Sequence, residues 1–340
     1  MSTDRLKLTA YFGERLRSGD RFAVDTLLDL FATHQVSTSV VLRGVAGFGP
    51  RHQLRTDVSL SLSEDPPVTV TAFDTAEKLS GLATEVVASL GRGLVTLEWA
   101  GGLDDTPLDR SAQVTVVLSR GARVEGRPAY VTVGERLRAH GFAAATAYCG
   151  VDGTTGGHRR RATFFGRNRE VPAMVLAVGP AAAARAVGAE LDTLPGVETV
   201  CTDAAQLCKV NGQLLARPAL PAPRQRLILH TAASDLHRGL PVHRAAVRAL
   251  LDIRPTAGLT VLHGIWGFQG DRPAHADRLF QLGRGAPVTT VMVDTADRIS
   301  AAFDIIDGLT GDVGVVSVGA VPAAVSIDDG EHRGSLDSDL

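Results

Sequence analysis

The sequence predicts an α+β protein made of three similar domains joined end to end, and three observations support this. First, a β-branched run that ends in a glycine-punctuated loop occurs at Gly44 and again at Gly264. Second, the shift of 220 residues that aligns these loops also places Asp74-Thr-Ala-Glu-Lys-Leu-Ser80 on Asp294-Thr-Ala-Asp-Arg-Ile-Ser300 without a gap. Third, a weaker copy lies between them, with its loop at Gly150. A period of roughly 105 to 115 residues is far longer than a solenoid repeat, so each copy is expected to be a complete domain.

The first copy shows the order of elements expected in each domain. Residues 6–12 alternate as a strand, and apolar side chains recur at helical spacing over residues 24–31. Further strands are expected at 36–43, 57–62, 68–73 and 94–99, and a second helix at 79–90. The order β-α-β, an extra strand in a loop, then β-α-β predicts a ferredoxin-like domain, an antiparallel sheet with both helices on one face.

The other two copies repeat this order. In the third, strands are expected at 227–229, 259–262, 288–293 and 313–318, with helices at 247–251 and 299–309. In the second, strands are expected at 113–118, 143–149, 173–178 and 197–202, with an alanine-rich helix at 181–191. The predicted domains are residues 1–105, a degenerate copy at 106–217, and 218–325. Residues 326–340 carry little apolar content and several acidic and serine residues, a composition typical of a disordered tail.

Composition excludes several classes of protein. The chain has 340 residues, 44% hydrophobic and 21% charged, with a net charge of -2, whereas nucleic-acid binders usually carry a basic excess. Its three cysteines have neither disulfide-framework nor zinc-site spacing. The N-terminus is polar and no apolar run approaches the roughly 20 residues that span a bilayer, so we expect a cytoplasmic protein.

Four sequence blocks follow one another in the first copy: Arg43-Gly-Val-Ala-Gly-Phe-Gly49, Leu62-Ser-Glu-Asp-Pro-Pro-Val68, Asp74-Thr-Ala-Glu-Lys-Leu79 and Gly93-Leu-Val-Thr-Leu-Glu98. Together they resemble the PII-like family known as domain of unknown function 190. They cover nearly all of the first copy and much of the third. The family commonly has a histidine just after the glycine loop; the first copy has Arg55 there and the third has His275. The middle copy lacks the charges of the Asp-x-x-Glu-Lys block.

The resemblance implies a fold and a function. Members of that family resemble PII signalling proteins, which are trimers of ferredoxin-like subunits with a nucleotide cleft between neighbours and a long loop after the second strand. It therefore implies that this chain closes on itself as a monomeric pseudo-trimer. Its implied activity is regulatory and not catalytic, through a small anionic effector, with an adenine nucleotide as the candidate. Its implied partner is a membrane channel or transporter, or another regulated protein.

The candidate binding residues surround the first and third glycine loops. Glycine amides can approach an anion closely, and cationic side chains clamp phosphate or carboxylate groups. The set comprises Arg43, Gly44, Gly47, Phe48, Gly49, Arg55, Lys78, Arg92, His263, Gly264, Gly267, Phe268, His275 and Arg298.

Each type of residue in this set also has a purely structural interpretation. The glycines can simply permit left-handed backbone angles, and the loop charges can be solvated. The aromatic residues Phe48 and Phe268 can pack beneath their own loops. At the second helix of each copy, Asp74 and Asp294 suit an N-cap, with Lys78 and Arg298 in the first turn. Gly91-Arg-Gly93 can end a helix as well as contact a phosphate.

Other functions are less well supported by the residues. A small phosphate-ester or acyl-phosphate hydrolase would need an amide side chain to position water, but the only asparagines, Asn168 and Asn211, lie outside the first and third glycine loops. A nucleic-acid module would need aromatics on the middle strands, which carry Val, Leu and Thr. The run His158-Arg-Arg-Arg161 is the one candidate patch for a nucleic acid or a docking partner. A trimeric metal-tolerance protein would need soft ligands that are scarce here.

Overall fold

The computed structural model describes residues 5–56, 65–101, 103, 110–163, 168–253, 258–276 and 285–336. Over these residues the chain is α+β, with six helices and two large antiparallel sheets of 8 and 13 strands. The strand expected at 57–62, the junction expected between residues 105 and 106, and residues 337–340 lie outside the described residues.

The first repeat contains two helices and a sheet with the strand order β4-β7-β1-β8. Its elements are β1 (Arg5–Gly13), β2 (Arg17–Ser18), β3 (Arg21–Phe22), α1 (Ala23–Thr33), β4 (Thr38–Arg43), β5 (Ala46–Phe48), β6 (Arg55–Thr56), β7 (Pro67–Thr75), α2 (Ala76–Ala88) and β8 (Arg92–Trp99). The alternation predicted for residues 6–12 places Leu6, Leu8 and Ala10 in a core with the apolar faces of α1 and α2.

The second repeat has the equivalent order β12-β15-β9-β16. Its elements are β9 (Ser111–Ser119), β10 (Arg123–Val124), β11 (Arg127–Pro128), α3 (Ala129–Ala139), β12 (Ala144–Cys149), β13 (Asp152–Thr155), β14 (His158–Arg159), β15 (Pro172–Pro180), α4 (Ala181–Asp192), β16 (Val197–Val210) and β17 (Gln213–Leu214).

The third repeat has the order β21-β24-β18-β25. Its elements are β18 (Arg224–Ala232), β19 (Leu236–His237), β20 (Leu240–Pro241), α5 (Val242–Asp252), β21 (Leu259–His263), β22 (Trp266–Gln269), β23 (His275–Ala276), β24 (Pro287–Thr295), α6 (Ala296–Thr310), β25 (Val315–Ala320), β26 (Ala323–Asp328) and β27 (Glu331–Ser335).

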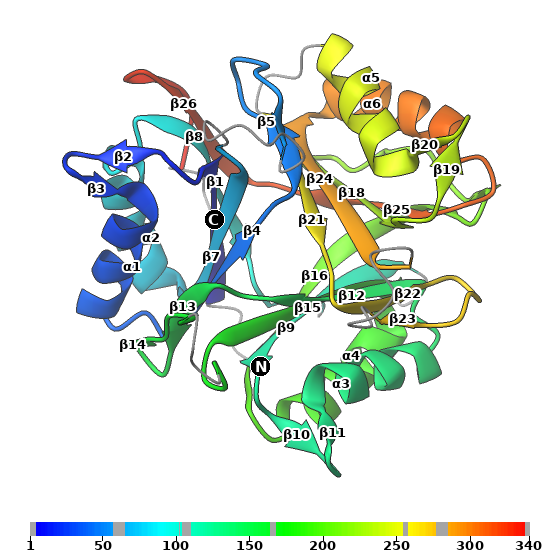
Figure 1. Ribbon diagram of the computed structural model, residues 1–340, viewed down its shortest axis with the longest axis horizontal. Helices are drawn as coiled ribbons and strands as arrows, with labels where there is room; N and C mark the ends of the chain where they lie inside the picture. The colour runs from blue at the N-terminus through cyan, green and yellow to red at the C-terminus, as the bar shows by residue number, and fades with distance from the viewer. Residues whose placement is uncertain are drawn as a thin grey trace.

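The three repeats surround a shared interior. The helices lie on the outside of the molecule and the sheets face its middle (Figure 1). An apolar cluster in this middle takes side chains from every repeat, including Phe73 of the first, Tyr148 of the second and Ile228 of the third. Each sheet is therefore buried on both faces, by its own helices and by the other repeats.

The strands of the glycine loops extend the sheets of neighbouring repeats. Strand β5 of the first repeat pairs with β21 of the third, β22 of the third pairs with β12 of the second, and β13 of the second pairs with β4 of the first. The three exchanges form a closed cycle. Because a strand bonded to an edge leaves fewer unpaired backbone groups, these loops serve as inter-repeat connections.

The glycines of these loops are required by the close approach of two backbones. A Cβ atom at Gly47 would lie 2.4 Å from the carbonyl oxygen of Leu259, and one at Gly267 would lie 2.5 Å from that of Ala145. Real Cβ atoms do not approach an oxygen so closely, so only glycine fits. Gly47 and Gly267, which belong to the predicted anion site, thus have a structural role in the strand pairing between repeats.

The last strands of the second and third repeats also pair with a neighbouring repeat. They join the second repeat to the third and the third to the first, in the reverse order of the glycine-loop strands. Strand β16 runs beyond β9 and pairs with β25 of the third repeat, while β26 pairs with β8 of the first. The structure differs here from the expectation of a disordered tail, because residues 326–335 lie in β26, its turn and β27. The turn is Asp329-Gly330, with φ of 49° and 88°, a pair that favours a two-residue hairpin. The composition of residues 326–340 does not indicate this hairpin, because β8, the strand with which β26 pairs, lies more than 200 residues earlier in the sequence.

A buried ion network joins all three repeats. Lys7, Gln113 and Arg226 occupy the same register position of β1, β9 and β18. Lys7 Nζ lies 3.0 Å from an Asp203 carboxylate oxygen and 3.3 Å from Glu98 Oε2, and Arg226 also bonds Glu98. Burial alone would raise the pKa of Glu98, but the charges of Arg226 and Lys7 outweigh it and lower the pKa.

Candidate functional site

A cavity of about 290 Å³ lies where the first and third repeats meet. The first repeat contributes the end of β1, the segment after β5 and the start of β8; the third contributes β21 and β24. We call this cavity the 1–3 cleft. It forms because β5 crosses to β21 and leaves the backbone at Gly49 and Pro50 on the rim between the two repeats.

The polar wall of the 1–3 cleft is strongly cationic. Four arginines, Arg15, Arg17, Arg55 and Arg92, line the cavity with one carboxylate, that of Asp65. Asp65 binds Arg55 Nη1 at 2.9 Å and accepts a 2.7 Å hydrogen bond from the Arg15 amide. Four arginines and one carboxylate among the lining residues suit an anionic ligand, because arginine offers planar, paired donors to phosphate and carboxylate groups.

Apolar side chains also line the 1–3 cleft. They are Phe48, Leu94, Leu259, Val291 and Val293. Phe48 is only 3% exposed and belongs to the core of the third repeat, so it packs beneath a neighbouring repeat rather than beneath its own loop. Next to these side chains, burial raises the pKa of Tyr11, so its phenol stays neutral near pH 7. The cleft therefore offers both apolar and cationic groups to a ligand.

Four of the residues proposed from sequence line the 1–3 cleft: Phe48, Gly49, Arg55 and Arg92. The other proposed residues of the first repeat lie in structural contacts. The amide of Gly44 donates to the Pro67 carbonyl at 2.7 Å, and Arg43 pairs with Glu14 at 2.8 Å. Lys78 lies 3.0 Å from Asp74, and its ammonium donates to the Gln35 carbonyl.

The N-cap of α2, the second helix of the first repeat, is not the residue expected from the sequence, Asp74. Thr75, not Asp74, is the N-cap of α2, and its side chain accepts from the Lys78 amide. Asp74 instead accepts hydrogen bonds at 2.8 Å from the amides of Ser37 and Thr75. It thus ties the start of α2 to the turn before β4. These bonds, with Lys78, lower the pKa of Asp74 although burial by itself would raise it.

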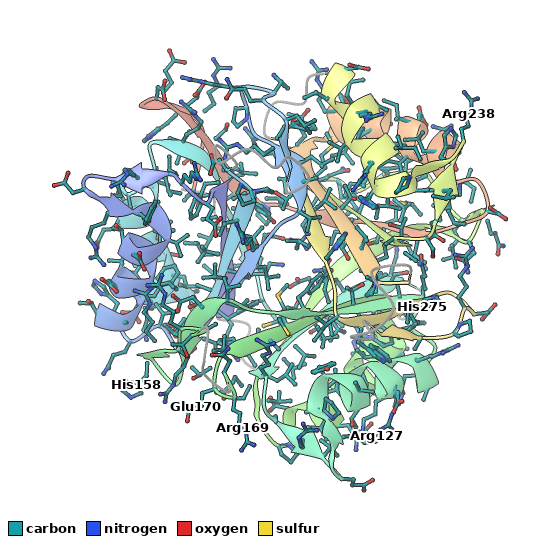
Figure 2. All side chains as sticks on the ribbon, in the orientation of Figure 1. Arg127, His158, Arg169, Glu170, Arg238 and His275 are labelled. Atoms are coloured by element: carbon teal, nitrogen blue, oxygen red, sulfur yellow. The ribbon has the colours of Figure 1, made fainter. Side chains whose placement is uncertain are left out.

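The corresponding position between the third and second repeats is filled. Gly267, Phe268 and His275 lie there, beside Thr146 and His230, around a free volume of about 0 Å³. We call it the 3–2 cleft; Figure 2 shows His275 near β22 and β23.

One side chain explains much of this filling. Gln269 stands where the first repeat has Gly49, and its amide donates to the buried carboxylate of Asp235 at 3.3 Å. Asp235 also accepts a 2.6 Å hydrogen bond from Arg272. Burial lowers the pKa of His230 to about 4, so the imidazole facing this position is neutral.

The remaining proposed residues of the third repeat have structural contacts. The Gly264 amide donates to the Pro287 carbonyl at 2.7 Å, as Gly44 does in the first repeat. His263 stacks edge-on against His243 with 5.9 Å between ring centres. Arg298 donates to the carbonyl of Ile253 at 2.9 Å. These three residues do not line the 1–3 cleft.

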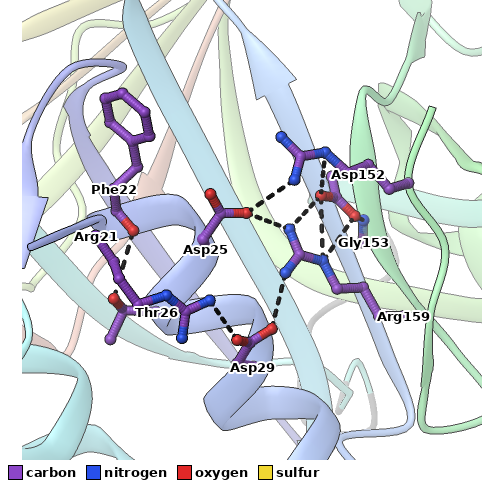
Figure 3. Close-up of polar contacts among 9 residues, drawn as sticks. Arg21, Phe22, Asp25, Thr26, Asp29, Asp152, Gly153 and Arg159 are labelled. Atoms are coloured by element: carbon purple, nitrogen blue, oxygen red, sulfur yellow. Dashed lines mark hydrogen bonds and ion pairs between the residues drawn. The ribbon is translucent and has the colours of Figure 1, made fainter. Parts of the chain in front are cut away.

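The third junction, between the second and first repeats, is held by an ion cluster (Figure 3). Arg159 binds Asp25 at 2.6 Å, Asp29 at 2.8 Å and Asp152 at 2.7 Å. Burial by itself would lower the pKa of Arg159, but the bonds to these carboxylates raise it.

The basic run of the middle loop is consequently engaged within the chain. Arg161 contacts Asp25 at 3.1 Å and Arg160 contacts Glu170 at 2.8 Å, in addition to the three carboxylates on Arg159. Figure 2 shows His158 and Glu170 together at the outer edge of the molecule. Arginines already bound to carboxylates do not form the free basic surface that a nucleic acid needs, which counts against that alternative.

Part of the 1–3 cleft is not indicated by the local sequence patterns. Arg15, Arg17 and Asp65 line it in addition to the predicted residues, and so do residues of the third repeat. The run Gly13-Glu-Arg-Leu-Arg17, directly after a predicted strand, was the available signal for the two arginines. Among the described residues, no three His, Cys, Asp or Glu side chains gather as metal ligands would, and no helix there is long and apolar enough to cross a membrane.

Fold and cleft together define a class: an α+β protein of three repeats with a candidate ligand cleft where repeats meet. The family model of domain of unknown function 190, described as an uncharacterized ACR, matches residues 5–100, 111–207 and 224–323. The chain therefore belongs to this family and carries three tandem copies of its domain.

Solved structures offer only distant likenesses. Aspartate kinase from Synechocystis is 10% identical, covers 95% of this chain and has a TM-score of 0.28; this chain spans 44% of that enzyme's length. A microcompartment protein from Desulfitobacterium hafniense is 12% identical over 63% of this chain and 96% of its own, with a TM-score of 0.20. The three N-terminal RNA-binding domains of the yeast splicing factor Prp24 are 11% identical, over 88% and 91%, with a TM-score of 0.16. TM-scores this low carry no argument about this chain.

Proposed function

We propose that this protein is a regulatory, PII-like protein that binds a small anionic effector in the 1–3 cleft. An adenine nucleotide is the first candidate, and the protein acts by binding a partner rather than by catalysis. The observation that carries the proposal is the cleft itself, a cavity of about 290 Å³ lined by four arginines, one carboxylate and several apolar side chains. A concave site with convergent polar groups is the usual form of a small-molecule site.

We also propose that each repeat is a ferredoxin-like domain and that the chain is a covalent pseudo-trimer in the cytoplasm. The strand orders β4-β7-β1-β8, β12-β15-β9-β16 and β21-β24-β18-β25 support this. In each repeat the first long strand (β1, β9 or β18) lies between the last two long strands, as in a ferredoxin-like sheet. The closed cycle of strand exchanges supports the threefold arrangement.

The chemistry of the cleft limits the ligand. Arg15, Arg17 and Arg55 suit phosphate or carboxylate oxygens, and the side chains around Phe48 and Leu259 suit a flat apolar group. A volume of about 290 Å³ is at the small end of ligand sites, which span roughly 300 to 1,000 Å³. The proposed effector is therefore no larger than a nucleotide.

The position of the cleft suggests how binding would be communicated. Gly49 and Arg55 lie at either end of the segment between β5 and β6, and both line the cavity. A ligand held by Arg55 would favour one arrangement of this segment, and a partner protein that prefers that arrangement would bind more tightly. By family resemblance we propose a membrane channel or transporter, or another regulated protein, as the partner.

Calorimetric titration with ATP, ADP, AMP and pyrophosphate tests the proposal. We expect binding by at least one of them, with stabilisation of about 2.7 kcal/mol at a ligand concentration of 100 Kd. Arg55→Gln should weaken it by about tenfold or more, because a charge-assisted hydrogen bond contributes about 1.5 to 3 kcal/mol. Arg248→Gln, on the exposed face of α5, makes the same change of charge and should bind normally. Absence of binding by all four compounds would overturn the proposal.

A further inference from the structure

The turn of the β26–β27 hairpin lies at the rim of the 1–3 cleft. Asp328 is directly opposite Arg92 in the pairing of β26 with β8, and Arg92 is the residue of β8 at which the cavity begins. The Asp329 amide donates to the Gly91 carbonyl at 3.0 Å, which anchors the turn to the start of β8. A segment from the end of the third repeat is thus built into the site of the first.

Two carboxylates of this turn bind two arginines of the first repeat. Arg92 Nη2 donates to Asp329 Oδ1 at 2.8 Å, and Arg51 Nε donates to Asp328 Oδ1 at 3.0 Å. Arg51 also bonds Asp329, and Arg92 Nε lies 3.3 Å from Asp328 without forming a hydrogen bond. The bonds to Arg92 and Arg51 lower the pKa of Asp329, so the turn is anionic near pH 7.

These contacts resemble those that an anionic ligand would make. Carboxylate and phosphate oxygens use the same guanidinium donors, so the turn and a ligand at Arg92 compete for them. The side chains of Asp328 and Asp329 are 40% and 59% exposed, and such solvated ion pairs are weak. A ligand that also reaches Arg55 inside the cleft can therefore displace them.

The second repeat ends in a similar hairpin that lacks these charges. Strands β16 and β17 are joined by Asn211-Gly212, with φ of 44° and 88°, nearly the angles of Asp329-Gly330. Asn211 is neutral, and β25, with which β16 pairs, carries no arginine. The acidic turn and its arginine partners therefore occur together at the open cleft, although the fold itself requires neither.

We propose that the Asp328-Asp329 turn is an internal anion that competes with the effector for Arg92, so that effector binding releases this turn from the rim of the 1–3 cleft. This inference rests on the function proposed for the 1–3 cleft. It adds a regulated element: the turn binds Arg92 in the empty protein and separates from it when an anion binds. It also makes effector affinity depend on the charge of the turn.

Asp329→Asn tests the competition without changing the turn. Asn accepts the φ of 49°, as Asn211 does at 44° in the second repeat, so the hairpin should still form. We expect pyrophosphate and ATP to bind this variant about threefold to tenfold more tightly than wild type at low salt. Glu331→Gln is the matched control, because it removes one acidic charge from the same hairpin, at a residue that pairs with Arg333 instead. It should leave affinity unchanged.

Hydrogen exchange of residues 323–335 is the second measurement. In wild type, saturating pyrophosphate should speed exchange of the turn amides at residues 329–331, while β26 (residues 323–328) stays protected by its pairing with β8. Without ligand, Asp329→Asn should keep the same protection of β26, showing that the hairpin still forms. Equal affinity of wild type and Asp329→Asn for a ligand that binds both would overturn the competition and leave the proposed function standing. Failure of both proteins to bind any of ATP, ADP, AMP and pyrophosphate would overturn the proposed function together with this inference.

Discussion

The 1–3 cleft and the 3–2 cleft have the same backbone plan but different contents. In both, a glycine-loop strand adds to the edge of the next repeat, β5 on β21 and β22 on β12. The first encloses about 290 Å³ and the second about 0 Å³. Gly49 of the 1–3 cleft occupies the position that Gln269 has in the 3–2 cleft. The comparison shows that repeated folding produces equivalent junctions, whereas a few side chains decide which junction has room for a ligand.

The two clefts differ in the charge of their lining residues as well as in volume. The 1–3 cleft has Arg55 where the 3–2 cleft has His275, and Asp65 where the latter has Gly285. Tyr11 and His230 occupy the same register position, and both are kept neutral by burial. Only the first cleft therefore combines a cationic wall with free volume.

The largest expected effect comes from the network that fastens the first repeat to the other two. Glu98→Gln leaves Arg226 and Lys7 buried with a carboxylate missing, and breaking a buried pair costs about 3 to 5 kcal/mol. Urea unfolding measures the free energy. Asp304→Asn, which removes an exposed contact with Arg217, should cost less than about 1 kcal/mol. Similar losses for the two variants would contradict a central role for the network.

The pH dependence of stability should reveal the neutral histidine of the closed cleft. His230 has a folded-state pKa of about 4, below the ordinary 6.5, so the unfolded chain binds its proton first. The stability from neutral His230 is fully present above pH 6.5 and is lost as pH falls toward 4, by about 1.4 kcal/mol per pH unit.

Urea unfolding of His230→Gln between pH 7 and 4.5 measures this contribution. The variant should show a shallower slope, with a part of the slope kept by His243, whose pKa burial also lowers to about 4. His332→Gln, on the exposed strand β27, should keep the full wild-type slope. An unchanged slope in His230→Gln would show that this imidazole is not held neutral.

The strand exchange at the open cleft should tolerate no side chain at its closest point. Gly47→Ala places a Cβ atom 2.4 Å from the Leu259 carbonyl, and the backbone shift should cost about 1 to 3 kcal/mol. Gly81→Ala in α2 meets nothing within 4 Å and should instead stabilise by about 0.5 to 1 kcal/mol. Thermal unfolding compares the two. A harmless Gly47→Ala would mean that β5 does not pair with β21.

The smallest effect on stability, but a specific one on binding, is expected from Gly49→Gln. It gives the open cleft the residue of the closed one, and a Cβ atom there meets nothing within 4 Å, so the free energy of unfolding should change by less than about 0.5 kcal/mol. Calorimetry should show nucleotide affinity reduced by about tenfold or more, because the side chain occupies ligand space. Unchanged affinity would indicate that ligands bind elsewhere.

Local patterns predicted much of each repeat but little of the assembly. Alternation over residues 6–12 placed Leu6, Leu8 and Ala10 correctly in a core, since the pattern of a strand is local. Arg43 was proposed as a clamp, yet it pairs with Glu14, and Gly44 donates to Pro67. Which partner a charge or an amide meets depends on strands far apart in the chain, and no spacing rule states it.

Sequence alone determined that there are three copies, that each alternates strands and helices in one order, and that glycine is needed in the loops. These properties follow from local periodicity and from the limits that a side chain sets on the backbone. Tertiary structure alone decided that the loops exchange strands in a cycle, that Asp328 and Asp329 meet Arg92 and Arg51, and that one junction is open. Those outcomes depend on contacts between residues more than 100 positions apart in the chain, where packing and charge are settled only once all three repeats are in place.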